Sequence, residues 1–255
     1  MNNGLWVAAS GMFANMYRQD VAANNMANLN TAGFKPEVVS MQWRDPERIE
    51  DHTPTDPNLL LEGLGGGLLV APVKTSWHRQ GNIVKTGNEL DVALMGKGFL
   101  AFEGAGATDQ ERMRLSRDGR LTLDREGYLV HTGTGLKAMD ESGEAIQLGN
   151  GTVTIRDDGS IEQNGSTVGR LRIVTAPESG LRKTGGNMMR LEGDVRLEPG
   201  EAEVQQGAVE GSAADPIQSL MEMTNATSAV SANARMVRIF DETMDAAINR
   251  FGRVA

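Results

Sequence analysis

The chain has 255 residues, 39% hydrophobic and 4% aromatic, with a formal charge of −9 and an isoelectric point near 5.0. This acidic balance, without a basic patch, argues against a nucleic-acid partner, because phosphates are bound by clustered Lys and Arg. The absence of cysteine excludes disulfides, thiolate metal sites and cysteine nucleophiles, and no apolar run approaches the roughly 18 residues that would predict membrane insertion.

An N-terminal helix is predicted by apolar residues that recur at alternating steps of three and four, which places them on one face. Gln19 is the single polar interruption of this seam. Trp6 and Phe13 lie on a second face, and a helix that is apolar on two faces usually has more than one neighbour. We expect the seam to form an assembly interface, and it consists of Leu5, Ala9, Met12, Met16, Gln19, Ala23 and Met26.

The helix runs into an asparagine-rich stretch that ends at Lys35. Asparagine competes with a helix through local hydrogen bonds, and Gly33 is a natural terminator, so a simple helix stop is one interpretation. The asparagines are more numerous than termination requires, which favours a contact surface whose amides bond backbone groups of a neighbouring chain. The residues assigned to this surface are Asn24, Asn25, Asn28, Asn30, Thr31, Gly33 and Phe34.

Residues 36–77 have no regular period, because Pro46, Pro54, Pro57 and the glycines between positions 63 and 67 break both helix and strand patterns. We interpret this segment as an extended arm with a role in assembly, and a disordered linker is the alternative.

From residue 78 to 204 the pattern changes to short alternating segments between turn dipeptides such as Asp118-Gly119, Asp158-Gly159 and Asn164-Gly165. The close spacing of these turns predicts short antiparallel strands, and no helical stripe is present. We therefore expect an all-β middle domain in this range.

A long C-terminal helix is predicted in the return segment 205–255, with Asp215 as its cap and Pro216 at its first position. Extending to residue 251, it would be about 55 Å long. Its apolar seam, also an expected assembly interface, consists of Met223, Ala226, Val230, Asn233, Val237, Phe240, Met244, Ala247 and Phe251.

The two terminal seams predict a coiled coil between the helices of segments 1–35 and 205–255, within one subunit or between subunits. If Leu5 lies opposite Ala247 in an antiparallel pair, the polar interruptions Gln19 and Asn233 come to one level. The predicted fold class is mixed, with an all-β middle domain of short antiparallel strands on a discontinuous α-helical coiled-coil domain formed by the N- and C-terminal helices.

Catalytic, cofactor and metal sites are not predicted. His52, His78 and His131 are far apart and have no second ligand at metal-binding spacing. Ser10 lies in a predicted helix without the glycines of a nucleophile elbow, and Lys97 is followed by Gly where a phosphate loop needs Ser or Thr. We expect no enzymatic activity.

The stretch from Ala23 to Lys35, with Ala-Asn-Asn leading to Asn-Thr-x-Gly-Phe and a basic residue, resembles the N-terminal signature of bacterial flagellar rod and hook proteins. The resemblance is closer to the basal-body rod proteins of the proximal and distal types (the FlgF/FlgG family) than to hook protein. It departs at residues 212–215, Ser-Ala-Ala-Asp, where family members often carry Ser-Asn-Val-Asn. Further similar segments are residues 4–5, 8–12, 90–94, 96–99, 116–119 and 206–212.

This resemblance implies a structural subunit that self-assembles helically into the hollow drive shaft between motor and hook. It also implies homo-oligomeric contacts, contacts with other rod and hook subunits, and delivery to the periplasmic rod by the flagellar type III export apparatus. No cleaved signal peptide is expected, since no Lys or Arg precedes Arg18 and no sustained apolar run follows. The alternative is a β-rich extracellular carbohydrate-binding or adhesive protein, against which the low aromatic content weighs.

Overall fold

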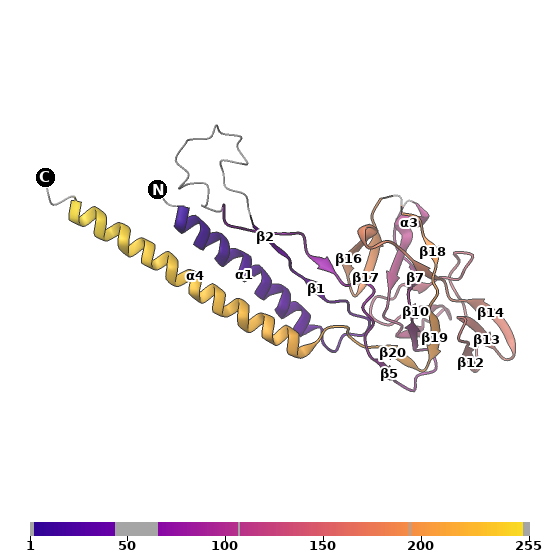
Figure 1. Ribbon diagram of the computed structural model, residues 1–255. Helices are drawn as coiled ribbons and strands as arrows, with labels where there is room; N and C mark the ends of the chain where they lie inside the picture. The colour runs from indigo at the N-terminus through magenta and orange to yellow at the C-terminus, as the bar shows by residue number, and fades with distance from the viewer. Residues whose placement is uncertain (1–2, 44–65, 107, 194, 252–255) are drawn as a thin grey trace. The chain divides into compact units, whose positions relative to one another are not determined.

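The computed structural model describes residues 3–43, 66–106, 108–193 and 195–251, and the chain divides into two compact units (Figure 1). The helical unit consists of Met1–Ala27, Glu37–Ser76 and Asp215–Ala255. The strand-rich unit consists of Asn28–Pro36 and Trp77–Ala214. The end of the predicted segment 1–35 and the start of the predicted segment 205–255 therefore belong to the strand-rich unit.

Two long helices, α1 (Asn3–Ala27) and α4 (Pro216–Phe251), pack against each other in the helical unit (Figure 1). The predicted start of α4 is confirmed, because Oδ1 of Asp215 accepts the backbone N–H groups of Ile217 at 2.8 Å and Gln218 at 3.1 Å. Pro216 has no N–H to satisfy at the first helical position. Local sequence signals thus fix where this helix begins.

Small residues line the side of α1 that is buried, and this differs from the predicted seam of α1. Ala8, Gly11, Ala14 and Ala22 are buried, whereas Met16 of the predicted seam is 44% exposed. Five buried positions each lie one residue N-terminal to a member of the predicted seam, namely Ala8, Gly11, Asn15, Ala22 and Asn25. The prediction from hydrophobic periodicity assigned the large apolar side chains to the helix contact, whereas the closely packed helices bury small side chains there.

The predicted register of the helix pair is wrong. A Cβ atom on Gly4 would lie 2.5 Å from Cζ of Phe240, and one on Gly11 would lie 3.1 Å from the amide nitrogen of Asn233. The helices are therefore antiparallel, but Asn233 lies at the level of Gly11, which is about 12 Å along the helix from Gln19. The two polar interruptions do not meet, because the glycines of α1 set the closest approach.

The described part of the predicted arm forms a narrow antiparallel ribbon, and residues 44–65 of the arm lie outside the described residues. Ser10 of α1 accepts the N–H of Leu68 at 3.3 Å, which attaches the ribbon to the helix. The strand pairs are β1 (Glu37–Val38) with β4 (Lys74–Thr75), and β2 (Met41–Trp43) with β3 (Leu68–Val70).

The strand-rich unit is built on a sheet whose main path runs β16-β17-β8-β7-β11-β10-β9, with all pairs antiparallel. Strand β15 (Ile173–Thr175) pairs with both β7 and β18 (Glu198–Pro199). In path order the strands are Leu181–Gly185, Met188–Leu191, Met113–Ser116, Phe99–Glu103, Lys137–Ala138, Leu129–His131 and Leu121–Leu123.

Further strands complete this unit: β12-β13-β14 form a separate sheet, β19 pairs with β6, and β20 pairs with β5. Two apolar clusters form the core, one around Phe102 and Ile161 and the other around Phe99 and Leu115. In the same order, these strands are Val153–Ile155, Ser160–Gln163, Ser166–Arg170, Glu203–Gln206, Val92–Met95, Ala208–Glu210 and Ile83–Lys85.

The prediction of an all-β middle domain needs one correction. A single helical turn, α3 (Asp109–Arg112), and a 3-10 turn, η2 (Glu178–Gly180), interrupt the strands. Thr108 caps α3 in a capping box with Glu111, and this short local signal lies outside any longer helical stripe. The fold is therefore a mixed one, with a helix at each end and a strand-rich middle.

Candidate functional site

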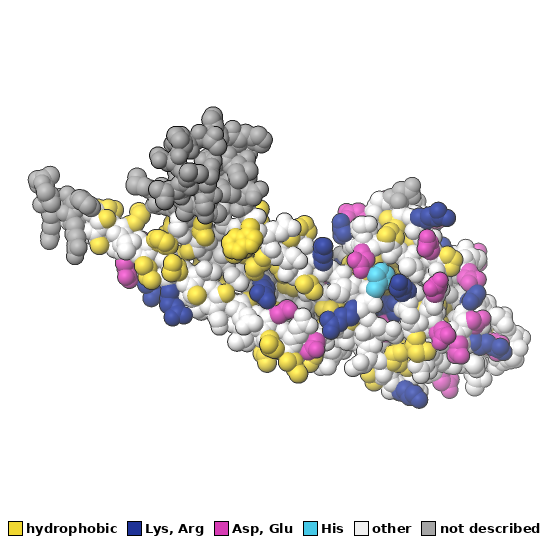
Figure 2. Space-filling view, in the orientation of Figure 1, with side chains coloured by type: hydrophobic (Ala, Val, Ile, Leu, Met, Phe, Trp, Pro, Cys, Tyr) yellow, Lys and Arg dark blue, Asp and Glu magenta, His cyan; other side chains and the backbone are white. Residues whose placement is uncertain are grey.

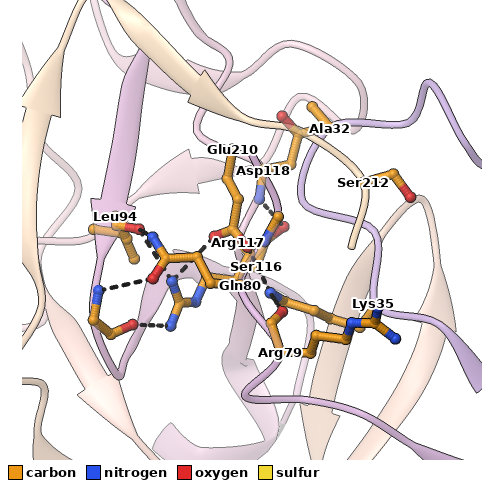
Figure 3. Close-up of polar contacts among 12 residues, drawn as sticks. Ala32, Lys35, Arg79, Gln80, Leu94, Ser116, Arg117, Asp118, Glu210 and Ser212 are labelled. Carbon is orange, nitrogen blue, oxygen red and sulfur yellow. Dashed lines mark hydrogen bonds and ion pairs between the residues drawn. The ribbon is translucent and has the colours of Figure 1, made fainter. Parts of the chain in front are cut away.

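Three segments that carry the sequence motifs converge in the strand-rich unit. They are the end of the asparagine-rich stretch, the Ser-Arg-Asp-Gly segment and the Gln-Gly-Ala-Val-Glu-Gly segment, which contribute Lys35, Arg117 and Glu210 (Figure 3). We call these three side chains the junction network. All are almost completely buried, with at most 2% of each side chain exposed.

Glu210 is the centre of the junction network. Lys35 Nζ donates to its Oε1 at 2.6 Å, Arg117 Nη1 donates to its Oε2 at 3.0 Å, and the backbone N–H of Gly81 donates to Oε1 at 2.9 Å. Lys35 also donates to the carbonyl of Arg79 at 2.6 Å, and Arg117 donates to the carbonyl of Leu94 at 3.2 Å. Each buried charge therefore has an opposite charge and at least one further polar partner.

Burial and pairing act in opposite directions on these groups. Burial lowers the pKa of Lys35 and of Arg117, while the charge and hydrogen bond of Glu210 raise both, and the balance leaves both pKa values lowered. The cations would be costly to bury without Glu210, because an uncompensated charge loses its hydration without an equivalent partner. The three motifs are thus interdependent: each supplies a charge that the others require.

Gly33 places the asparagine-rich stretch against the junction network. Its φ is +66°, and a Cβ atom there would overlap the backbone of Arg117 and Asp118, so both conformation and space require glycine. Its N–H donates to the carbonyl of Glu210 at 2.7 Å, and the carbonyl of Phe34 accepts the N–H of Ala213 at 3.0 Å. The segment that follows α1 in the sequence and the segment that precedes α4 are therefore held side by side.

Side chains from the β16–β17 hairpin fix the same segment from another direction. Lys183 Nζ donates to the carbonyl of Lys35 at 2.9 Å and lies 4.7 Å from the ring centroid of Phe34. The side-chain amide of Asn187 donates to the carbonyl of Ala32. Residues 32–35 thus have partners on three separate parts of the strand-rich unit.

A buried carboxylate lies beside the network. Burial would raise the pKa of Asp118, but contacts with His131 and Arg120 outweigh it and lower the pKa to about 2. Arg120 Nη2 is 2.7 Å from Asp118 Oδ2, and His131 Nε2 is 3.2 Å from the same oxygen. The N–H of Thr134 donates to His131 Nδ1 at 3.1 Å and so holds the imidazole ring beside Asp118.

The predicted residues of the asparagine-rich stretch have different environments. Asn25 is buried within α1, and its amide bonds both the carbonyl (2.7 Å) and the N–H (3.0 Å) of Glu37 in the same chain. Gly33 and Phe34 are buried in the strand-rich unit. Asn24 and Asn30 are exposed, and Asn28 and Thr31 are half-buried. An intermolecular role for this stretch stays a prediction.

The predicted seam residues of the helices are distributed as follows. On α1, Met16 and Ala23 are exposed and the others are half-buried, namely Leu5, Ala9, Met12, Gln19 and Met26. On α4, Ala226 is buried and the half-buried residues are Met223, Val230, Asn233, Val237 and Phe240. Met244 and Ala247 are exposed, and the side chain of Phe251 lies outside the described residues.

Large hydrophobic side chains remain exposed on both helices (Figure 2). On α1, Trp6 is 72% and Phe13 is 65% exposed, which agrees with the second apolar face predicted from the sequence. On α4, Ile217 is 70% and Ile248 is 66% exposed. A surface of this kind usually marks a protein contact, because exposed apolar area is unfavourable in water.

Sequence reasoning missed the junction network, although all three residues stand in motifs that had been noted. A signal was available for Lys35 and Glu210, which are charges next to apolar or glycine residues, whereas Arg117 stands among other charged residues and gives no such signal. Among the described residues, no group of three or more His, Asp or Glu side chains is arranged to hold a metal ion. No helix in the described part of the chain is long and apolar enough to span a membrane.

Comparison with known proteins places these features in a family. Residues 5–35 match the family model "Flagella basal body rod protein", and residues 205–250 match "Flagellar basal body rod FlgEFG protein C-terminal". The chain is 30% identical to the flagellar basal-body rod protein FlgF of Caulobacter vibrioides over 258 residues, which cover 100% of both chains. It is also 30% identical to FlgG of Agrobacterium fabrum, covering 93% of this chain and 95% of that protein.

The fold is a discontinuous helical unit, formed by α1 and α4, with a strand-rich unit between them in the sequence. The segments that match the family models include most of α1 and of α4, and two of the three junction residues, Lys35 and Glu210. The chain belongs to the FlgF/FlgG family of flagellar basal-body rod proteins and is a structural rod subunit.

Proposed function

We propose that the chain assembles helically, through α1 and α4, with its own copies and with other rod and hook subunits into a hollow shaft that transmits torque from motor to hook. The observation that carries this proposal is the exposed apolar surface of a helix pair formed by the two segments that match the rod family. A hook protein FlgE of Treponema pallidum is 31% identical over 156 residues, which supports contacts between related subunits.

The burial pattern of the helix pair supports a coiled-coil element as part of this proposal. Buried and half-buried positions together recur at steps of three and four on both helices, and glycine and alanine on α1 allow close approach. Once α1 and α4 are packed together, their outer faces still present Trp6, Phe13 and Ile217 to solvent. Copies that bury these side chains against one another would gain about 1.5–3 kcal/mol for each large apolar side chain.

Location follows from the same family. We propose that the subunit is delivered by the flagellar type III export apparatus, without cleavage of a signal peptide, and is incorporated into the periplasmic part of the basal body. None of the relatives named above is a carbohydrate-binding or adhesive protein. The alternative function therefore has no support from the comparisons.

The test uses a flagellated strain that lacks its own copy of this gene. Full-length chain should restore motility, whereas a chain that ends at Asp215 should not, because α1 then has no partner. Phe13→Asp should also abolish motility while the purified protein keeps its helix content, since Phe13 is 65% exposed in the single chain. Val168→Asp, at a 44% exposed apolar position of the strand-rich unit, is the control. Motile cells with the truncated chain or with Phe13→Asp would refute the proposal.

A further inference from the structure

A stripe of charged side chains, divided into a basic and an acidic block, runs along the C-terminal half of α4. Six charged residues lie there, of which five are exposed and the sixth, Arg250, has a side chain outside the described residues. At about 100° per residue, the five exposed residues fall within an arc of about 120° on one face of the helix. The two basic residues come first and the three acidic residues follow, in the order Arg235, Arg238, Asp241, Glu242 and Asp245.

This charge stripe has no ionic partner within the described part of the chain, since none of its members forms an ion pair there. The side of α4 that contacts α1 carries Asn233 and Phe240 and lies on a different face. Residues 241–249 are exposed throughout, because Phe240 already lies beside Gly4 at the start of α1. Exposed Met244 and Ile248 flank the acidic half of the stripe.

We infer that the charge stripe is a contact with the α4 helix of a second copy of this chain, in which the basic half of one helix faces the acidic half of the next. The basic pair and the acidic group are centred about six residues apart, so a parallel neighbour must be displaced by about 9 Å along the helix axis. Apolar side chains beside the acidic half would be covered in the same contact.

The charge pattern selects this displacement. Two parallel copies in register would place basic residues against basic residues and acidic against acidic, which is repulsive. A displaced copy pairs the basic half of one stripe with the acidic half of the other. The resulting pair of α4 helices keeps one unpaired basic half at one end and one unpaired acidic half at the other end. Such a contact is heterologous and propagates, whereas an antiparallel contact would pair the charges reciprocally and close as a dimer. The inference rests on the proposed self-assembly and specifies its register.

Charge reversal tests the contact in the strain that lacks the native gene. R235E/R238E makes the stripe wholly acidic, and D241K/D245K makes it mainly basic. Each variant alone should lose motility, and expression of both together should restore it, because acidic and basic stripes then alternate. Circular dichroism of the purified full-length variants checks that the helices are intact.

Each outcome of this experiment decides the inference. If either variant alone supports motility, the stripe is not a contact, although the rod proposal stands as long as full-length chain restores motility. If neither variant works and the mixture also fails, the charges meet some other protein and the second copy is the wrong partner. Failure of the full-length, unchanged chain to restore motility would refute the proposed function instead.

A cysteine variant gives an independent measurement, because the chain has no cysteine of its own. In R238C/D245C the two positions are about 10.5 Å apart on one helix, beyond the separation of about 7 Å that a disulfide can bridge. The two cysteines therefore cannot form a disulfide within one chain. In a displaced parallel contact, the cysteine at position 238 of one copy lies near the cysteine at position 245 of the next, so oxidation of cells should give a ladder of covalent multimers. Products that stop at the dimer, or no product, would overturn the inference. M236C/T243C has the same spacing on another exposed face and should give no ladder.

Discussion

Replacing Glu210 by glutamine tests the junction network most directly, because the substitution keeps the size of the side chain and removes its charge. Glu210 is fully buried and accepts hydrogen bonds from Lys35, Arg117 and the N–H of Gly81. A glutamine has one acceptor oxygen, and its NH2 group would face one of the two cations. Breaking a buried ion pair in this way costs about 3–5 kcal/mol, because a charge is left uncompensated.

That cost is a large part of the 5–15 kcal/mol by which single domains are stable, so the strand-rich unit should unfold at clearly lower urea concentration. The assay is urea unfolding of the purified full-length chain followed by circular dichroism. Glu203→Gln is the matched control, since Glu203 is exposed on the neighbouring strand β19 and should change stability by less than about 0.5 kcal/mol.

A triple variant separates the cost of an unpaired charge from the value of the ion pairs. Replacing Lys35, Arg117 and Glu210 together by Met, Met and Leu leaves no buried charge, and stability should recover most of the loss, as buried ion pairs often exchange for apolar groups at little cost. The reasoning would be refuted if Glu210→Gln matched the Glu203→Gln control, or if the triple variant were less stable than Glu210→Gln.

Three further predictions concern the glycines and the buried carboxylate. Gly33→Ala should destabilise the chain by about 1–3 kcal/mol more than Gly87→Ala in urea unfolding, since both have positive φ but only Gly33 touches neighbouring backbone. Asp118→Asn should be less stable than wild type at pH 5, and this difference in unfolding free energy should shrink by about 2 kcal/mol as the pH falls to 2. The reason is that the pKa of Asp118 is about 2 in the folded chain against an ordinary 3.8, so the folded wild type loses the stabilising anion over this pH range. In a double-mutant cycle of thermal unfolding, the effects of Gly4→Ala and Phe240→Ala on stability should not be additive, because a Cβ atom on Gly4 would lie 2.5 Å from the ring of Phe240.

These predictions have distinct failure conditions. Equal effects of the two glycine variants would show that the backbone approach at Gly33 is not restrictive. A constant gap between wild type and Asp118→Asn across that pH range would mean that the carboxylate is not stabilised as an anion in the fold. For the double-mutant cycle that tests the helix register, the control replaces Phe240→Ala by Ile248→Ala, because the register predicted from the sequence places Ile248 opposite Gly4. Coupling of Gly4→Ala with Ile248→Ala, and none with Phe240→Ala, would restore that register.

The strong local signals of the sequence predicted the long elements. Asp215 and Pro216 marked the start of α4 because a cap and a proline act within one turn. The face of α1 that packs on α4 was misplaced, since periodicity gives weight to Leu and Met while a close helix contact selects Gly4 and Gly11. The junction network could not be predicted from local pattern, because Lys35 and Glu210 are 175 residues apart in the sequence.

The pairing of the two chain ends has a consequence for the order of folding. α1 contains the first described residues and α4 the last, so the helical unit can close only after nearly the whole chain is available. The strand-rich unit contains more local pairings, such as β16 with β17 and β13 with β14, which close short loops at a smaller entropic cost. A newly made chain should therefore form its strands first and complete the proposed assembly surface of α1 and α4 last, which would delay the proposed assembly until the helix pair has formed.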